Sequence, residues 1–595
     1  MENFDNKIYT LDYVLSASAK MNGPFKPLKI AVVRNITLES IEPYLTYFIQ
    51  SIGFKPTYYF SLYDDAIQQI HDSNSPLYQF KPDIIIMAIK LESLCPDLFN
   101  NFCALSDKKR EQTQMFIQQY FEQLFSSLKK NTSAPVLFNN FETPTAPSFG
   151  IYDSQSLNHQ QYTIKKLNIL LVELIQTHSH IYLVDVDLLQ HRIGSQHYYD
   201  LRYWYIGKAP YSKLAYPLLA KEYSKYCRAL FGKNKKCLIL DLDNTLWGGI
   251  IGEDGINKIQ LGHAYPGSAF VDFQKAILTL YYRGVILAIC SKNNLTDVMP
   301  VLNEHPDMVL RLKHFSVMKI NWNNKVDNIR EIAQEINIGL DSLVFIDDSD
   351  FEINFVKELL PEVTSIKLSK DPAQYAYFLM NFGLFDTLLY SEEDKNRTIM
   401  YRAEASRNQL KSSFDNIENY YRSLSIQVEI KRADEYSLSR ISQLTQRSNQ
   451  FNLTTQRYTE SQLKEKMHSL QSDVFYLTVS DRFGKHGLVG VAIIDYHEGR
   501  KTAYINTFLL SCRVISYNVE NVLLKTILDT CRSKGIQEVI GEYIQTDKNN
   551  LVKNFYTERY FQVESSADNR TVYKYDLRDN HNIVPNYFDL ISTER

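Results

Sequence analysis

The sequence lacks most of the features that mark secreted, membrane-bound or zinc-binding proteins. Its 595 residues include only seven cysteines and no CxxC pair, so neither a disulfide framework nor a zinc site is indicated. No apolar run is long enough to span a bilayer. The first residues, Met1-Glu2-Asn3-Phe4-Asp5, lack the basic-then-apolar order of a signal peptide. We therefore expect a protein of the reducing cytoplasm that does not bind membranes.

An excess of charge of one sign is also missing. Lys and Arg number 65 and Asp and Glu number 68, which gives a net charge of −3 at pH 7. No overall field therefore draws the chain to nucleic acid or to anionic lipid. The hydrophobic fraction of 44% is typical of a globular protein, and the length predicts about three domains.

Short apolar runs indicate two α/β domains. Residues 1–232 contain four such runs, separated by amphipathic stretches that can form crossover helices: 28–33, 83–88, 135–138 and 181–184. Residues 233–390 contain three more, at 237–240, 285–289 and 343–346. Runs that are apolar at every position are typical of parallel strands buried on both faces. We therefore predict two layered α/β domains with parallel sheets.

The rest of the chain has a different pattern. Residues 391–425 are polar and helical in pattern, and they predict a linker. From 426 to 577, several strand-like runs precede one amphipathic helix and a further strand, an order typical of an α+β domain. Residues 578–595 form a tail with little periodicity. The fold class predicted for the whole chain is α/β multidomain, with an α+β domain after the second parallel sheet.

The most informative motif follows the apolar run at 237–240. It reads Asp241-Leu242-Asp243-Asn244-Thr245, and its two carboxylates, spaced i, i+2, leave the strand on the same side. The carboxyl edge of an open parallel sheet is where ligands bind. Two carboxylates held this close repel each other unless a cation lies between them, and hard oxygen ligands suit Mg²⁺. Asp241 can then act as a nucleophile, and Asp243 as a proton donor and acceptor, in phosphoryl transfer.

Three further elements occur where a phosphotransferase sheet needs them. Ser291 follows the second strand, and its hydroxyl and backbone N–H can hold a phosphoryl oxygen. Lys325 opens the next helix, where its ammonium group can offset charge on the nucleophile and the phosphate. Asp347 and Asp348 end the third strand and complete a Mg²⁺ site.

In this order the four elements resemble the motifs of the haloacid dehalogenase (HAD) superfamily. The resemblance implies a Rossmann-like parallel sheet in which Asp241 is the nucleophile and Asp243 the general acid/base. Phosphate would be held by Thr245, Ser291, Lys292 and Lys325, although Lys292 is equally well explained as a solvated loop charge. Mg²⁺ would be held by Asp241, Asp243, Asp348 and Asp347, and Asp348-x-x-x-Glu352 fits the last motif of the family better than a pattern starting at Asp347.

The segment after the first motif resembles one particular branch of this superfamily. Asp241–Gly249, followed by Gly252–Gly255 and Leu261-Gly262, is similar to the signature of FkbH-like proteins, HAD subfamily IIIC, and so is Cys290–Asn294. Between Asp241 and Ser291 there is room for this glycine-rich segment and one helix but not for a large cap domain. The site should therefore lie open to a bulky partner.

The resemblance to FkbH-like proteins implies a Mg²⁺-dependent glyceryltransferase and phosphatase. Such proteins take the glyceryl group from 1,3-bisphosphoglycerate and remove phosphate. They load the three-carbon unit onto the phosphopantetheine thiol of a holo acyl carrier protein, as a precursor for polyketide biosynthesis. A stand-alone HAD-type small-molecule phosphatase is the alternative. A third class is an acyltransferase that acts on an amine or an amino-sugar.

Residues 426–577 resemble the acetyltransferase-like (GNAT-like) domain that ends FkbH-like proteins. The matching pieces are Gly490–Ile493, Phe508–Val514, Lys548–Asn550 and Asn554–Tyr556. The loop Arg513–Asn518 lacks the glycines usual in the pyrophosphate cradle, which argues against the use of free acetyl-CoA. Cys512 would lie beside the acyl thioester and could carry the glyceryl group, and Cys290 is the rival acceptor. Either thiol could instead be a buried apolar residue.

Residues 1–232 resemble the SGNH-hydrolase-like domain that precedes the catalytic part of long FkbH-like proteins. The Ser–His pair of such hydrolases is missing. The position of the nucleophile reads Arg34-Asn35-Ile36-Thr37, and the terminal Asp-x-x-His motif reads Asp200-Leu201-Arg202-Tyr203. We therefore expect this domain to be a non-catalytic docking element or scaffold.

Overall fold

The computed structural model describes residues 9–63, 66–178, 180–388, 390, 403, 407, 410, 414–497, 501–515 and 517–590. Most of the predicted linker, residues 391–425, lies outside this set, as do the first residues of the chain. The chain divides into two compact units, one of Ile8–Arg228 with Thr459–Gln462 and one that holds Ala229–Tyr458 and Leu463–Arg595. Among the described residues, no helix has both the length and the apolar character needed to cross a membrane.

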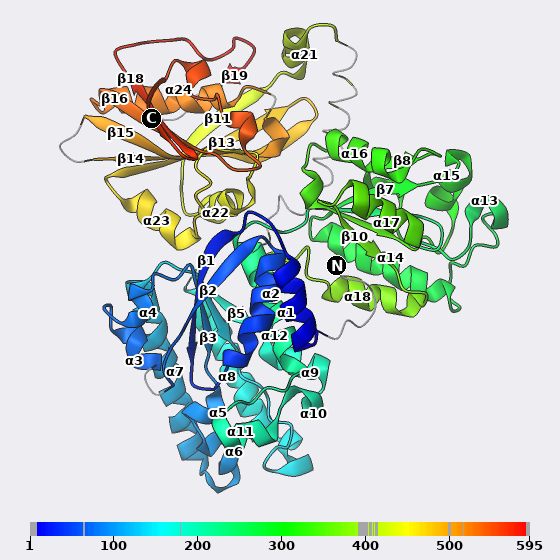
Figure 1. Ribbon diagram of the computed structural model, residues 1–595, viewed down its shortest axis with the longest axis vertical. Coiled ribbons are helices and arrows are strands. Elements are labelled where there is room, and N and C mark those ends of the chain that lie inside the picture. Colours follow the sequence, from blue (N-terminus) through cyan, green and yellow to red (C-terminus); the bar gives the residue numbers. More distant parts are fainter. Residues whose placement is uncertain are drawn as a thin grey trace. The chain divides into compact units, whose positions relative to one another are not determined.

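The first unit is built on a parallel five-stranded sheet with the order β2-β1-β3-β4-β5 (Figure 1). Its strands are β1 Lys26–Arg34, β2 Phe54–Phe60, β3 Ile84–Ala88, β4 Val136–Asn139 and β5 Ile181–Val184. Its longer helices are α1 Leu11–Lys20, α2 Glu42–Ser51, α7 Asp107–Asn131, α8 Gln160–Gln176, α9 Val186–Ile193 and α12 Ala215–Leu230. The shorter ones are α3 Ala66–His71, α4 Pro76–Gln79, α5 Leu91–Leu94, α6 Asp97–Asn100, α10 Ser195–Tyr198 and α11 Leu201–Gly207.

Both faces of this sheet are buried, as its continuous apolar strands predict. Ala31, Val33, Met87 and Phe138 belong to a core that α7 and α8 cover. The alternating residues, such as Ile30 and Ile86, are buried as well. Helix α7 begins where the Ser106 hydroxyl accepts a hydrogen bond from the Lys109 N–H at 3.3 Å, a side-chain cap that satisfies one of the free N–H groups of the first turn.

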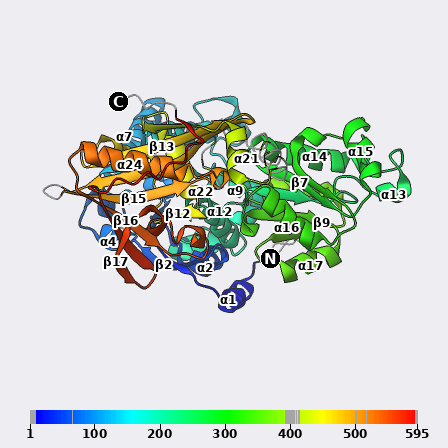
Figure 2. The same cartoon turned by 90° about the horizontal axis from the view of Figure 1, so that it is seen from above.

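The second unit contains another parallel sheet, with the order β10-β9-β6-β7-β8. Its strands are β6 Cys237–Leu240, β7 Ile286–Ser291, β8 Phe315–Ile320, β9 Leu343–Asp347 and β10 Thr364–Lys367. Its helices are α13 Ile251–Asp254, α14 Gly267–Tyr282, α15 Leu295–Glu304, α16 Lys325–Glu335, α17 Asp350–Leu359 and α18 Tyr375–Asn381. Figure 2 shows α14 and α15 on one side of the strands and α16 and α17 on the other.

The two faces of this sheet have separate cores. Leu238, Leu240 and Ile289 pack toward α14 and α15, whereas Cys237, Ile239 and Cys290 pack toward α16 and α17. This alternation follows from the two-residue repeat of a strand, and it explains why β6 and β7 must be apolar at every position.

The remaining sheet of the second unit is mixed. Its order is β17-β18-β16-β15-β14-β13-β11-β19, with β12 paired to β15. Its strands are β11 Gln427–Arg432, β12 Phe451–Asn452, β13 Ser472–Asp481, β14 Gly484–Tyr496, β15 Thr502–Leu510, β16 Glu538–Ile544, β17 Gln562–Ala567, β18 Arg570–Asp576 and β19 Asp589–Leu590. Its helices are α21 Ile417–Leu424, α22 Leu438–Arg447, α23 Glu460–His468 and α24 Glu520–Ser533.

Most pairings in this third sheet are antiparallel, but β11 runs parallel to β19, and β15 runs parallel to β16. Helix α24 connects these two strands and contributes Leu523, Ile527 and Cys531 to the larger core. Helix α22 covers the opposite face with Leu438, Ile441 and Leu444. Two parallel α/β sheets and one mixed α+β sheet confirm the predicted α/β multidomain fold class.

Candidate active site

The site of the second unit lies at the carboxyl edge of its parallel sheet. Strand β6 is central, with β7 on one side and β9 on the other. Asp241 follows β6, while Ser291 ends β7 and Asp347 ends β9. Because the three strands are parallel and adjacent, these side chains leave the sheet at the same edge.

Three carboxylates meet at this edge. Oxygen atoms of Asp241, Asp347 and Asp348 lie within 4.8 Å of one another. Lys325 bridges two of them, since its Nζ lies 2.5 Å from Asp347 Oδ2 and 3.0 Å from Asp241 Oδ1. Helix α16 fixes the position of Lys325, because the Asn324 side chain caps the helix by accepting a 2.8 Å hydrogen bond from the Asp327 N–H.

The charges of this group fit a divalent cation. Burial and the neighbouring charge of Asp241 raise the pKa of Asp347, although Lys325 opposes the shift. The same two causes raise the pKa of Asp348 to about 6. Carboxylates whose ionised forms are disfavoured in this way are stabilised when a cation binds between them. An all-oxygen set of ligands is the set that Mg²⁺ prefers.

Asp243 lies outside the group of three carboxylates. Its Oδ1 accepts hydrogen bonds from the Trp247 indole N–H at 2.9 Å and from the Ile251 backbone N–H at 3.1 Å. Its Oδ2 accepts one from Asn293 Nδ2 at 3.1 Å. Burial raises the pKa of Asp243 above its usual value, while these three hydrogen bonds oppose the shift. These contacts orient the Asp243 carboxylate, and its predicted roles as a metal ligand and as a general acid/base stay predictions.

Asn293 belongs to the FkbH-like segment Cys290–Asn294, but the sequence motifs predicted no role for it. Its Nδ2 contacts both Asp243 Oδ2 and the Ser291 hydroxyl, each at 3.1 Å. It thus joins the general acid/base candidate to the phosphate-binding candidate. The signal in the sequence was its place in that segment, two residues after Ser291.

The other predicted phosphate-binding residues have different surroundings. The ammonium group of Lys292 pairs with Glu352 Oε1 at 2.6 Å and is one-third exposed. The second carboxyl oxygen of Glu352 is buried and has no hydrogen-bond partner among the described residues. Thr245 is fully buried, and its hydroxyl is also without a partner in the described part of the chain. Lys292 is therefore held as an ion pair at the rim of the site.

The segment between β6 and β7 contains only α13 and α14. It therefore forms no separate domain above the site, as its length predicts. Gly249, with φ of +94°, allows the tight turn after the first motif, where a Cβ would lie 2.5 Å from an Asp254 oxygen. Large apolar side chains next to the motifs are exposed: Ile250, Tyr265, Leu295, Trp322 and Phe351.

The two candidate thiols differ in their exposure to solvent. Cys290 has no exposed surface and belongs to the core under α16. Burial raises the pKa of its thiol far above the usual value, and the thiol donates weakly to the Lys325 carbonyl, with 3.8 Å between the sulfur and the oxygen. This position argues against the prediction of Cys290 as an acyl acceptor, because the thiolate is the nucleophile. Cys512 is partly exposed, and its carbonyl accepts a 2.7 Å hydrogen bond from Asn337 Nδ2.

Helix α24 begins just after the loop Arg513–Asn518, where the pyrophosphate cradle would lie. Glu520, in its first turn, is buried and pairs with Arg559 at 3.1 Å. Burial raises the pKa of Glu520 to about 7, although Arg559 opposes the shift. A buried carboxyl group at the helix N-terminus disfavours a second anion there.

In the first unit, the positions expected of a hydrolase pair have structural contacts. Arg34 forms an ion pair with Glu39, and Asp200 caps α11 by accepting a 3.1 Å hydrogen bond from the Tyr203 N–H. At the carboxyl edge of the sheet, Lys90 lies 3.6 Å from Glu142, whose other oxygen accepts a 3.1 Å hydrogen bond from Tyr211. These contacts are compatible with a non-catalytic role, which stays a prediction.

The family described as FkbH, N-terminal domain, matches residues 39–224. The N-terminal part of the protein BF1531 from Bacteroides fragilis, which contains a phosphatase domain and was crystallised with Mg, is 29% identical. The match covers 64% of this chain and 100% of that one, with a TM-score of 0.58. No curated protein matches the chain.

Two acetyltransferase structures are similar to a quarter of the chain. The ribosomal-protein-S18-alanine N-acetyltransferase from Escherichia coli is 12% identical over 25% of this chain and 94% of that one, with a TM-score of 0.21. The PaiA N-acetyltransferase from Thermoplasma acidophilum, in complex with coenzyme A, is 14% identical over 25% and 99%, also with a TM-score of 0.21. These likenesses support no conclusion about activity.

The site and the likeness to a phosphatase-containing structure define the class of the protein: it is an enzyme of the hydrolase or transferase kind with a HAD-type phosphatase domain. The match of residues 39–224 indicates a relationship to the FkbH family. Over these residues the chain matches the FkbH N-terminal domain, and it is similar to FkbH-like proteins.

Proposed function

We propose that the protein is a glyceryltransferase and phosphatase that requires Mg²⁺. It dephosphorylates 1,3-bisphosphoglycerate and loads the glyceryl group onto the phosphopantetheine thiol of a holo acyl carrier protein in polyketide-type biosynthesis. The FkbH N-terminal match supports the family part of this proposal, and the structure crystallised with Mg supports the cofactor.

One observation carries the phosphatase part of the proposal. Three carboxylates from two neighbouring strand ends converge with a buried lysine that contacts two of them. A cation held by Asp241, Asp347 and Asp348 would supply charge stabilisation to the phosphoryl oxygens. Lys325 contacts only two of the three carboxylates, so its single positive charge leaves an excess of negative charge that a cation would offset.

The side chains then have separate tasks. The Asp241 carboxylate attacks phosphorus and forms an aspartyl-phosphate as the alkoxide leaves. Asp243, oriented by Trp247 and Asn293, gives a proton to that alkoxide and later takes one from the water that hydrolyses the intermediate. Lys325 and the Ser291 hydroxyl stabilise the negative charge of the phosphoryl group.

The transfer part of the proposal depends on Cys512. Its thiolate attacks the acyl carbon of the acyl phosphate, a C–S bond forms, and inorganic phosphate leaves. Cys512 is the partly exposed member of the two candidate thiols. We expect Cys512→Ser to retain phosphate release from a simple phosphate ester but to lose the protein-bound acyl species in intact-mass spectra. Normal acylation of that variant would remove Cys512 from the mechanism.

The decisive experiment incubates the full chain with Mg²⁺, 1,3-bisphosphoglycerate and a holo carrier protein. Intact-mass measurement of the carrier should show a gain of one glyceryl group. Apo carrier protein, which has no thiol arm, is the matched control and should gain nothing. Phosphate release without any gain on the holo carrier would instead identify a stand-alone phosphatase.

A further inference from the structure

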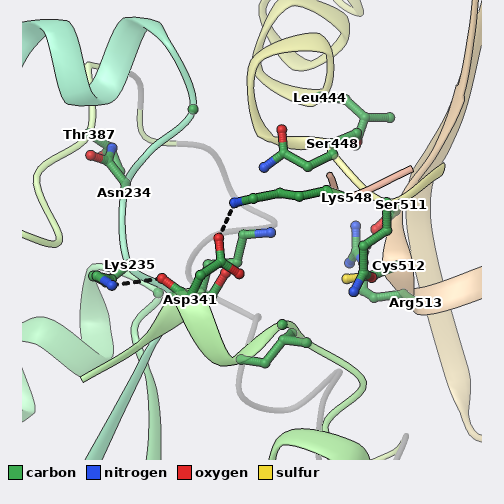
Figure 3. Close-up of a pocket in the computed structure, with 18 of the residues that line it drawn as sticks. Asn234, Lys235, Asp341, Thr387, Leu444, Ser448, Ser511, Cys512, Arg513 and Lys548 are labelled. Carbon is green, nitrogen blue, oxygen red and sulfur yellow. Dashed lines mark hydrogen bonds and ion pairs between the residues drawn. The ribbon is translucent and has the colours of Figure 1, made fainter. Parts of the chain in front are cut away.

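Asp241 and Cys512, the two groups that react in the proposed function, lie near opposite edges of one sheet. Strand β9 ends with Asp347 at the carboxyl edge, whereas Asp341 lies in the turn just before β9 begins. Lys548 pairs with Asp341, and Cys512 lines the same cavity of about 330 Å³ (Figure 3). The Cys512 thiol therefore lies near the amino edge, away from the three carboxylates.

Helix α16 shows the same separation. It begins at Lys325, whose ammonium group contacts Asp241. Two residues after the helix ends, Asn337 donates a 2.7 Å hydrogen bond to the Cys512 carbonyl. Its 11 residues span about 16 Å, so a three-carbon molecule cannot contact both places at once. Under the proposed function the three-carbon unit must move from one place to the other, and a long flexible arm can carry it.

One large apolar side chain beside the carboxylates is held out in the solvent. Trp322 lies in the loop between β8 and α16, three residues before Lys325, and it is 69% exposed. A single exposed apolar residue is common on protein surfaces, so exposure alone assigns no role to Trp322. Its attachment and its place relative to the reacting groups carry the argument.

A hydrogen bond anchors the indole ring of Trp322. The indole N–H donates to the side-chain oxygen of Asn294 at 2.9 Å, and the Asn294 amide donates to Asp297 at 3.0 Å. Asn294 occupies the N-cap position of α15, yet its side chain caps no backbone N–H there. An asparagine at this position usually accepts a hydrogen bond from the first turn of the helix. Here the same oxygen holds the indole instead.

The loop that carries Trp322 is attached to the phosphate-binding strand. The backbone N–H of Asn321 donates a 3.2 Å hydrogen bond to the Ser291 carbonyl. The Asn321 side-chain oxygen accepts hydrogen bonds from the Asn323 N–H and from Asn328 Nδ2, each at 3.0 Å. Both the backbone and the ring of Trp322 are therefore positioned before any substrate binds, which reduces the entropy that binding would cost.

Trp322 lies on the side of the site from which the proton is supplied. Its partner Asn294 follows Asn293 in the chain, and Asn293 contacts both Asp243 and Ser291 at 3.1 Å. Because Asp243 protonates the departing alkoxide in the proposed function, the leaving group lies next to this segment. The indole is thus placed to contact the leaving group rather than the phosphoryl group.

An indole ring binds apolar and flat groups. The molecule 1,3-bisphosphoglycerate offers none, because two phosphates, a carbonyl and a hydroxyl surround its three carbons. A pantetheine arm offers methyl groups, methylene groups and flat amides. We propose that Trp322 determines specificity for a three-carbon phosphate ester carried on a pantetheine arm, so that this phosphate is removed after the unit has been loaded. The inference rests on the proposed function and assigns the order of its steps.

Each step in this order has a defined place. The Cys512 thiolate attacks the acyl carbon, a C–S bond forms, and the first phosphate leaves. The thiolate of the arm then displaces the Cys512 sulfur and carries the phosphorylated unit to the other edge of the sheet. There the P–O bond breaks as Asp241 takes the phosphoryl group and Asp243 protonates the alkoxide, and water releases the second phosphate.

The fluorescence of Trp322 tests the contact without turnover. The chain has three tryptophans, of which Trp247 is fully buried and Trp204 is half-buried, and the difference between the wild type and Trp322→Phe isolates the third. The probes are two thioesters of the phosphonate analogue of 3-phosphoglycerate, in which a methylene group replaces the ester oxygen. With Mg²⁺ present, we expect the pantetheine thioester to shift the emission of Trp322 to shorter wavelength and the methyl thioester to leave it unchanged.

Kinetics of the hydrolysable thioesters give a second readout. Trp322→Ala should raise the KM for the pantetheine thioester about tenfold relative to the KM for the methyl thioester, the ratio that burial of about 55 Å² of apolar surface gives. Trp322→Phe should keep part of this preference, because it retains a ring. The matched control is Tyr282→Ala, which removes an exposed ring at the end of α14, just before β7 begins at the amino edge. It should leave the ratio unchanged.

The possible outcomes differ for the contact and for the phosphatase site. Equal shifts with both probes, no shift with either at millimolar concentration, or an unchanged KM ratio in Trp322→Ala would overturn the proposal. If both readouts agree with it, faster turnover of the thioester on a carrier protein than on coenzyme A identifies the carrier as the source of the arm, and the reverse identifies coenzyme A. Phosphate release from the methyl thioester that depends on Asp241 is measured separately, so failure of the Trp322 contact and failure of the phosphatase assignment are distinguishable.

Discussion

Removal of the Lys325 charge is the sharpest test of the site. Lys325 and its partners are almost completely buried, with side-chain exposures of 4% for Lys325, 9% for Asp241 and 0% for Asp347. Lys325→Met keeps most of the volume but leaves the two carboxylates without their cation. Breaking a buried pair in this way costs about 3–5 kcal/mol, and loss of a charge next to the phosphoryl group slows turnover about a hundredfold or more.

The chain offers a matched control for this variant. Lys319, on β8, also contacts two carboxylates, Glu331 at 2.6 Å and Glu335 at 2.5 Å. Those carboxylates are 50% and 40% exposed, so Lys319→Met should cost about 1 kcal/mol or less. Lys325 and Lys319 have the same number of carboxylate partners but differ in burial. Comparing their variants therefore shows whether burial or the number of ion pairs determines the loss of stability.

The measurement is urea unfolding of the full chain in a chelator, with phosphate release followed in parallel. A second change, Asp347→Asn, in the Lys325→Met background should recover part of the lost stability, because it removes one uncompensated charge. Equal costs for the Lys325 and Lys319 variants, or a cost below about 1 kcal/mol for Lys325→Met, would refute the electrostatic account of the site.

Three further predictions follow from the same structure. Asp241→Asn should abolish phosphate release without unfolding the protein, because the change keeps the shape of the side chain and removes the nucleophile. Turnover at the wild-type rate would show that Asp241 is not the nucleophile. Mg²⁺ at about 100 times its Kd should stabilise the protein by about 3 kcal/mol. Asp348→Asn should diminish this stabilisation in a thermal-shift assay. An undiminished stabilisation would show that the ion binds elsewhere. Burial and nearby positive charge lower the pKa of His180 from 6.5 to about 4, so the unfolded chain binds a proton that the folded chain does not, and stability should fall by up to about 3 kcal/mol as the pH decreases from 6.5 to 4. His180→Gln should make this decline shallower in denaturant titrations, and an identical decline would show that other groups cause it.

With the exception of β5, which lies at the edge of its sheet, the strands that the sequence predicted are those in the middle of the sheets. Strands β6, β7 and β9 each have a neighbour on both sides and a core on both faces, and this burial forces the continuous apolar runs. Strands β2, β8 and β10 lie at sheet edges, and they were not predicted. An edge strand tolerates polar residues and proline, as in Phe54–Phe60, which contains Lys55 and Pro56.

In the candidate site, too, the sequence predicted some features and not others. The motifs predicted the position of Asp241, Ser291 and Lys325 because each stands at a fixed place relative to a strand or helix end. They could not predict that Asn293 bridges Asp243 and Ser291, since this contact depends on the spacing of two different strands. They also ranked Asp347 below Asp348, whereas the structure places both near Asp241 and gives Asp347 the contact with Lys325.

The two-residue strand β12 has a consequence for the behaviour of the chain in concentrated solution. Where β15 and β16 separate, their backbone N–H and C=O groups would form two facing unpaired edges, and such edges are templates for strands of other molecules. The segment Phe451–Thr454 covers them with its own backbone. A chain in which this segment is displaced or shortened should therefore expose unpaired strand edges and self-associate. We expect the pairing of β12 to protect the protein from aggregation.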